Sequence, residues 1–242
     1  MLSGKHYKTA FVIGSLALAL AIGPWGTYCS AAIIGVIGTP IPLTTLLVDG
    51  ETLTVDDKVF SDFEYTFTGE MPAPANVNVI PIQDPDGNFG IRFQGGFMDL
   101  PSSQGPSDAL IAYNVASTGR LISDAHLAGN PNVLGDVGSI SVTETFLPIG
   151  PGGQYTMEIF DDENLNMAVL MDEVFFVPPV QMLSVQKDIL AIAVSTSQSV
   201  TLSFVDQTFS QIPEPITAVS LIAGVIAVGL ARRGRLRCRR ND

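Results

Sequence analysis

The residues that could do chemistry in this 242-residue chain are mainly carboxylates, with one histidine, His126, outside the first ten residues. Asp124 and His126 lie two apart, so in a strand they share a face and suggest the acid and base of a nucleophilic triad. Side chains two residues apart in a strand project in parallel, so the carboxylate of Asp124 is not directed at the imidazole of His126. In addition, no Gly-x-Ser-x-Gly turn supplies a serine. We therefore expect an exposed polar strand face and predict no catalytic residues.

One acidic turn has the spacing of a cation loop. Asp84, Asp86 and Asn88 alternate as the first ligands of a calcium loop do, but the sixth position is not glycine and the twelfth is Gly95, where a bidentate acid is required. An EF-hand is therefore rejected. A looser calcium site stays open beside the simpler interpretation, a Pro-Asp-Gly turn.

The other acidic positions are less specific. Asp161, Asp162 and Glu163 indicate either an acidic turn or a cation site. Glu144 shares a strand face with Ile140, Val142 and Phe146, and we expect a bulge or an edge position to explain it. Carboxylate pairs could perform glycosidase chemistry, but 22 acids between residues 33 and 212 make that signal non-specific.

The cysteines exclude thiolate chemistry from the middle of the chain. Cys29 and Cys238 are the only two, and both lie near the ends. Between them neither a disulfide nor a zinc site of the usual nitrogen and sulfur type can form. We predict no cofactor.

These side chains must be positioned by strands. Alternation over 61–68 places Ser61, Phe63, Tyr65 and Phe67 on one face, and 121–128 places Leu121, Ala125 and Leu127 inward. The apolar range 109–115 suits a central strand, and further strands are expected at 139–147, 154–160, 169–176, 183–194 and 200–209. Regular turn signals separate them, so we predict an all-β fold, an antiparallel, jelly-roll-like β-sandwich.

The charge distribution excludes one class of partner. Four basic residues oppose 22 acidic ones between residues 33 and 212, although the whole chain carries only −12. Such a surface repels polyphosphate, so nucleic-acid binding is excluded, while solubility, divalent cations and cationic partners are favoured.

The N-terminal segment is typical of a secretory signal. A short basic region is followed by an uninterrupted apolar run over 11–22, and the small residues Ala31 and Ala32 offer the cleavage site. We predict a signal peptide over 1–32 and an acidic β-sandwich domain over 33–210, exported through the secretion translocon. An uncleaved signal anchor is the alternative.

The C-terminal segment over 211–242 combines three features. Pro213, Glu214 and Pro215 form an extended strip that cannot pair into a sheet, because two backbone donors are missing. The uncharged range 216–231 would span about 24 Å as a helix, which predicts a short transmembrane helix. A positive-inside cluster then follows at 232–240, consisting of Arg232, Arg233, Arg235, Arg237, Arg239 and Arg240.

The order of these three features resembles the PEP-CTERM sorting signal of Gram-negative bacteria. The resemblance covers about 30 residues. It implies recognition by an exosortase-like membrane protease, a transient stay in the inner membrane, loss of the tail, and sorting to the cell surface or extracellular matrix. Phrases in the middle, at 57–66 and 203–209, resemble a PEP-CTERM group of unassigned function.

Two functions follow as expectations. The first is a non-enzymatic surface or matrix protein, sorted by an exosortase and associated with extracellular polysaccharide. The alternative is a β-sandwich module that binds carbohydrate or acts as a calcium-dependent adhesin, with weak polysaccharide hydrolysis as a remote third.

Overall fold

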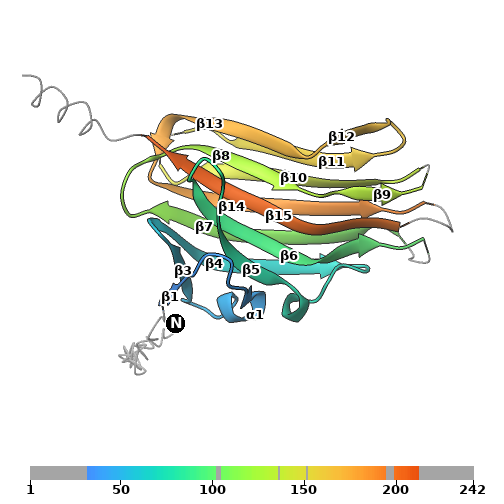
Figure 1. Cartoon of the computed structure of the whole chain (residues 1–242), viewed down its shortest axis with the longest axis horizontal. Coiled ribbons are helices and arrows are strands. Elements are labelled where there is room, and N and C mark those ends of the chain that lie inside the picture. The colour runs from blue at the N-terminus through green and yellow to red at the C-terminus, as the bar shows by residue number, and fades with distance from the viewer. Residues whose placement is uncertain (1–31, 102–104, 136, 151, 195–198, 213–242) are drawn as a thin grey trace, which may run out of the picture.

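The computed structural model describes residues 32–101, 105–135, 137–150, 152–194 and 199–212, which form two packed β-sheets (Figure 1). Sheet A contains, in spatial order, β1 (Ala32–Ile34), β3 (Thr52–Val55), β4 (Lys58–Thr68), β7 (Ser107–Ser117), β14 (Met182–Ile192), β10 (Ser139–Pro148), β11 (Tyr155–Asp162) and β12 (Met167–Val169).

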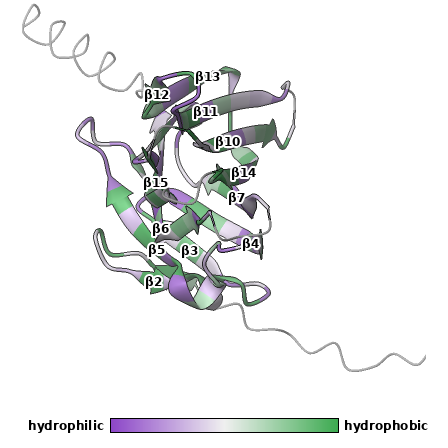
Figure 2. Ribbon diagram, turned by 90° about the vertical axis from the view of Figure 1, so that its right-hand side faces the viewer, coloured by the Kyte–Doolittle hydropathy of each residue, from purple (hydrophilic) through white to green (hydrophobic). Residues whose placement is uncertain are grey.

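Sheet B faces it, with the spatial order β13 (Met171–Val180), β8 (Ile122–Gly129), β15 (Ser199–Gln211), β6 (Phe89–Asp99), β5 (Asn78–Gln83) and β2 (Ile41–Pro42); β9 (Asn132–Leu134) also pairs with β15. Helix α1 (Leu43–Leu46) and the 3-10 turn η1 (Pro74–Asn76) connect the early strands. Figure 2 shows the two layers from one end. The predicted all-β sandwich is confirmed, while its jelly-roll-like connectivity stays a prediction.

The chain crosses between the sheets repeatedly in its second half. β7, β10 and β14 belong to sheet A, whereas β8, β13 and β15 belong to sheet B. All pairings but one are antiparallel; β1 pairs with β3 in parallel. Because neighbours such as β7 and β14, or β6 and β15, are distant in sequence, side chains far apart along the chain meet on one face.

Most predicted strands are present. The range 109–115 lies in β7, which is central in sheet A, and 183–194 forms the strand β14 over most of its length. The ranges 139–147, 154–160 and 200–209 fall in β10, β11 and β15. β5 and β6 lie outside every predicted range, although they flank the turn expected at 84–88.

The predicted alternation of 61–68 is confirmed from Phe63 to Thr66, where Phe63 is buried and Glu64 and Thr66 are exposed, but it is interrupted before Phe63. Asp62 has a φ of 54°, and the pairing of β4 with β7 shifts register between Ser61 and Glu64. This bulge turns both Phe60 and Phe63 into the core, while Phe67 remains 43% exposed. A bulge adds one residue to a strand, so alternation cannot be extrapolated through it.

Two other ranges need correction. In β8 the inward residue is Ile122, while Leu121 precedes the strand and is exposed; Ala125 and Leu127 are buried as predicted. The range 169–176 is not one strand, because β12 ends at Val169 in sheet A and β13 begins at Met171 in sheet B.

The centre of the core is aromatic. The Tyr113 ring lies 5.9 Å from Phe60, 5.6 Å from Phe63 and 5.8 Å from Phe93, centroid to centroid. Phe209 of sheet B packs 6.2 Å from Phe60. Rings at these spacings in tilted or stacked contact stabilise the sandwich across its two sheets.

The described ranges contain no helix long and apolar enough to cross a bilayer. The predicted leader up to Ala31, the sorting motif, the apolar range 216–231 and the arginine cluster lie outside them, whereas Ala32, the other predicted cleavage residue, begins β1. The signal peptide, the domain bounds and the C-terminal span therefore stay predictions.

Candidate functional site

A groove of about 880 Å³ lies on the outer face of sheet B. Along β15, Val205, Gln207 and Phe209 are buried, so the alternate residues Asp206 and Thr208 point outward. The groove collects outward side chains of β5, β6, β15, β8 and β13 and part of the turn at 84–86. Its position thus follows from strand alternation in five strands that are distant in sequence.

An ion pair occupies the middle strands of the groove. Arg92 of β6 lies opposite Asp206 of β15, and its Nε and terminal nitrogen donate to the two carboxylate oxygens at 2.6 and 2.7 Å. The guanidinium carbon also lies 4.1 Å above the ring centre of Phe204. The hydrogen bonds to Asp206 raise the pKa of Arg92, more than burial lowers it. The two hydrogen bonds and the contact with the ring together hold the Arg92 guanidinium in one orientation.

The charge of the groove is strongly negative. Asp84, Asp86, Asp172, Glu173 and Asp206 line it, and Arg92 is the one Lys or Arg among the described lining residues. The apolar part of the lining is aliphatic, formed mainly by Ile80, Ile82 and Met171. No aromatic side chain is among the described residues that line it. Anionic ligands are disfavoured at such a surface.

Of the predicted pair Asp124–His126, His126 lines this groove and Asp124 lies next to it on β8. His126 is half-buried, and its Nε2 lies 2.9 Å from both Asp124 Oδ1 and Ser210 Oγ. In a nucleophilic triad the acid and the serine occupy opposite ring nitrogens. Here the other nitrogen, Nδ1, is 3.7 Å from Glu173 Oε2, beyond hydrogen-bonding distance. The arrangement forms a polar strand face, with Ser210 as a partner that the sequence did not indicate. The expectation that this face is exposed is wrong for Asp124, which is buried.

The candidate calcium residues form a tight polar turn. Asp84 Oδ1 accepts the backbone N–H groups of Asp86 and Asn88, and Oδ2 accepts Asn88 Nδ2 and Thr208 Oγ1, each at 2.9–3.0 Å. Burial alone would raise the pKa of Asp84, but the hydrogen bonds from Asn88, Thr208 and Asp86 lower it overall. Asp84 thus ties the turn to β15. The calcium hypothesis stays a prediction.

The second acidic turn is also engaged by protein donors. Asp161 Oδ2 accepts the Val133 N–H at 2.8 Å, and Asp162 Oδ1 accepts the backbone N–H groups of Asn164 and Leu165. Over the residues that the structure describes, no group of three His, Cys, Asp or Glu side chains could hold a metal ion.

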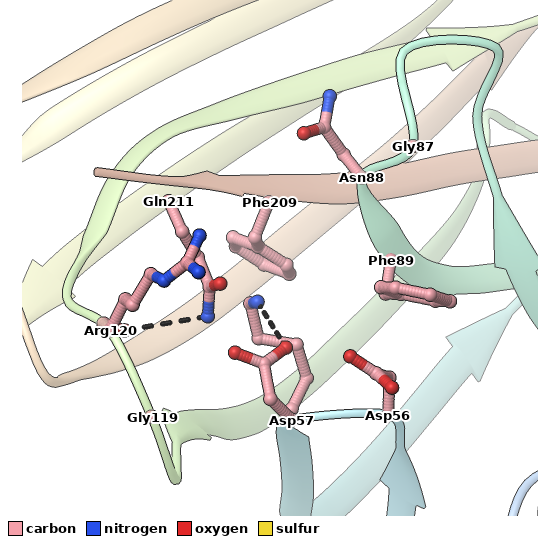
Figure 3. Close-up of a pocket in the computed structure, with 10 residues that line it drawn as sticks. Asp56, Asp57, Gly87, Asn88, Phe89, Gly119, Arg120, Phe209 and Gln211 are labelled. Atoms are coloured by element: carbon pink, nitrogen blue, oxygen red, sulfur yellow. Dashed lines mark hydrogen bonds and ion pairs between the residues drawn. The ribbon is translucent and has the colours of Figure 1, made fainter. Parts of the chain in front are cut away.

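A second, smaller hollow of about 410 Å³ lies at one end of the sandwich (Figure 3). Lys58 is buried there and donates to Asp57 Oδ1 at 2.8 Å. Gln211 donates to the carbonyl of Arg120 at 3.4 Å and to Ser117 Oγ at 3.0 Å. Ser117 Oγ also donates to Asp57 Oδ2 at 3.2 Å. These contacts join the β3–β4 turn, the end of β7 with the turn that follows it, and the end of β15, and they close this end of the sandwich.

The expectation for Glu144 is wrong. It sits in β10 between β14 and β11, in a regular pairing without a register shift, and it is fully buried. Lys187 of β14 lies directly opposite and donates to Glu144 Oε1 at 2.5 Å and to Gln207 Oε1 at 2.7 Å. The hydrogen bond from Lys187, which the sequence analysis did not single out, explains why a glutamate can face the core.

No protein-family profile matches the chain, and no curated protein matches it. Three matching solved structures are weakly similar. TmCBM61 in complex with β-1,4-galactotriose is 9% identical over 61% of this chain and 88% of its own, with a TM-score of 0.32. A carbohydrate-binding module of the β-sandwich superfamily is 8% identical over 62% of this chain and 57% of its own, with a TM-score of 0.25.

The third is the enzymatically active domain of tailspike protein 4 from bacteriophage CBA120, 8% identical over 65% of this chain and 20% of its own, with a TM-score of 0.24. Likeness at this level carries no conclusion about ligand or activity.

Proposed function

We propose that the protein is an exported, non-enzymatic surface or matrix protein whose β-sandwich binds a neutral or amino-bearing polysaccharide in the groove of sheet B. The observation that supports it most is the Arg92–Asp206 pair, held in the groove between aliphatic and acidic side chains. Concave sites that bind small ligands or segments of polymers combine apolar lining with a few fixed polar groups.

A polyhydroxylated ligand suits this chemistry. Arg92 and Asp206 remain 33% and 21% exposed, so the guanidinium keeps donors and the carboxylate keeps lone pairs for neighbouring hydroxyls. Hydroxyls both donate and accept, which lets one sugar ring satisfy such a pair. Ile80, Ile82 and Met171 offer apolar contact to the ring carbons.

The groove charge selects among polysaccharides. Five carboxylates against one guanidinium disfavour uronic acids, sulfates and phosphates. Neutral sugars, or sugars bearing a protonated amine, avoid this repulsion. The geometry at His126, with acid and serine on one nitrogen, supports binding rather than acyl transfer.

Binding can be tested with the secreted protein on an array of neutral, amino-bearing and acidic glycans. Asp206→Asn should weaken binding at least about tenfold, equivalent to about 1.4 kcal/mol. Glu64→Gln removes the same charge from an exposed position on β4 of sheet A, and should bind as the wild type does. Equal binding by both variants, or a preference for acidic glycans, would contradict the proposed ligand class.

Export and sorting rest on the two terminal signals. Replacement of Pro213, Glu214 and Pro215 by alanine should leave the protein in the inner-membrane fraction with its tail uncleaved. The wild type should appear at the surface or in the medium with a lower mass. Identical mass and fractionation in both would refute sorting by an exosortase-like protease.

A further inference from the structure

Three polar side chains meet inside the apolar core, between the two sheets. Lys187 and Glu144 are opposite each other in sheet A, and Gln207 reaches them from β15 of sheet B. All three are fully buried. Lys187 Nζ lies 2.5 Å from the carboxylate oxygen Oε1 of Glu144 and 2.7 Å from the side-chain oxygen Oε1 of Gln207.

The cluster is poorly built for stability alone. Glu144 Oε2 and the neighbouring Tyr113 hydroxyl are buried without a hydrogen-bond partner among the described residues. Replacing a buried ion pair by apolar residues of similar size is often neutral or stabilising, so stability does not explain its presence. An incompletely satisfied buried cluster calls for another explanation, such as a chemical one.

The environment favours the neutral forms of both ionisable groups. Burial lowers the pKa of Lys187, against the opposing effect of Glu144, and raises the pKa of Glu144 to about 7, against that of Lys187. Transfer of one proton from the ammonium to the carboxylate leaves an amine and a carboxylic acid without changing the net charge. A neutral lysine amine is a nucleophile.

The amine is also within reach of an electrophilic carbon. A carbonyl bond is about 1.23 Å long, so Nζ lies at most about 3.9 Å from Gln207 Cδ. Reactive ground-state geometries have the reacting atoms about 3–3.5 Å apart. Only a small movement of two side chains separates the observed arrangement from such a geometry.

We propose that Lys187 and Gln207 become joined by an intramolecular amide bond, with Glu144 as the proton carrier. Nζ attacks Cδ and forms the new N–C bond, while the acid form of Glu144 protonates the carboxamide oxygen. The tetrahedral intermediate collapses, its hydroxyl proton returns to Glu144 as the carbonyl re-forms, the bond between Cδ and Nε2 breaks, and ammonia leaves. Glu144 passes a proton from Nζ to the departing nitrogen, so one amine and one carboxamide give one substituted amide and one ammonia, with no oxidant or other reactant.

Attack on Gln207 fits the cluster better than attack on Glu144. Condensation with Glu144 would release water and would consume the only acid that the described residues place against the amine. Condensation with Gln207 keeps that acid in place throughout. It also links β14 to β15, covalently joining the two sheets.

Such a bond would take the role that a disulfide has in many exported proteins. Residues 30–237 contain no cysteine, so no disulfide can lock the sandwich. An amide between two central strands would join the sheets without an oxidising environment. This inference does not depend on the ligand of the groove.

Mass spectrometry of the full chain, recovered from its host, tests the bond directly. The intact mass should be lower by one ammonia than the processed sequence requires, and digestion should give a branched peptide that contains Lys187 and Gln207. A mass that matches the unmodified sequence would overturn the inference. So would loss of water, or loss of ammonia with both residues in separate linear peptides.

Two variants and one control assign the chemistry. Gln207→Met and Glu144→Gln should each keep the full sequence mass, since one removes the electrophile and the other the proton carrier. Gln186→Glu removes a carboxamide from an exposed position adjacent to Lys187, and should retain the loss of ammonia. If the first two variants fail to fold, the branched peptide of the wild type still decides the question.

Discussion

The bulge at Asp62 determines which aromatic residues of β4 stabilise the protein, and Phe60→Ala tests it. The Phe60 ring is fully buried and packs 5.9 Å from Tyr113 and 6.2 Å from Phe209. Removing a buried phenylalanine ring costs about 3–5 kcal/mol. In a domain of 150–250 residues this corresponds to a decrease in Tm of about 6–20 °C.

Phe67→Ala, in the same strand, is the matched control. Phe67 is 43% exposed and its main ring contact is with Tyr65, at 5.6 Å. The expected loss is about 1 kcal/mol or less. Urea unfolding followed by circular dichroism gives both free energies, provided that the m-value is unchanged. An uninterrupted alternation through Asp62 would turn Phe60 out of the core, so a loss for Phe60→Ala no larger than that for Phe67→Ala would refute the bulge.

Two further predictions concern sheet B. A Cβ at Gly90 would lie 1.8 Å from the Gln207 carbonyl oxygen, so Gly90→Ala should cost about 3 kcal/mol or more in urea unfolding. Gly96→Ala, with open space around its Cβ, should cost less than about 1 kcal/mol, and equal costs would contradict the close approach of β6 and β15. The lowered pKa of Asp84 means that its contribution to stability is complete above its unfolded pKa of about 3.9 and is lost as the pH falls. The Tm of Asp84→Ala should therefore depend less on pH below about pH 5 than the wild-type Tm, and parallel curves would argue against this role.

The sequence predicts the fold class better than the details of its faces. Strands such as 109–115 and 139–147 can be predicted because the apolar or alternating pattern that identifies them lies within one short segment. The alternation of 61–68 could not be extrapolated back to Phe60, because one residue, Asp62, takes a left-handed conformation in a bulge that shifts the phase. The junction at Leu170 could not be recognised from the sequence, because no glycine, proline or asparagine marks a turn between β12 and β13.

The candidate sites depend on pairings between distant segments. Arg92 and Asp206 are 114 residues apart, and neither is unusual by its local sequence. The sequence correctly places Glu144 on an apolar strand face. The bulge or edge position inferred from it was wrong. A search for a lysine on another apolar strand face would have found Lys187 among Val185, Ile189 and Ala191.

The position of β15 has a mechanical consequence. Asp206 and Thr208 of the groove lie on the strand that ends at Gln211, just before the proposed sorting segment. A tether beyond Gln211 and a polymer held in the groove would pull on β15 along its axis. That load acts in shear on the strand, which pairs with β6 and β8 on its two sides. All of the hydrogen bonds under load must then break together, so β15 is well placed to resist such a load in the proposed surface protein.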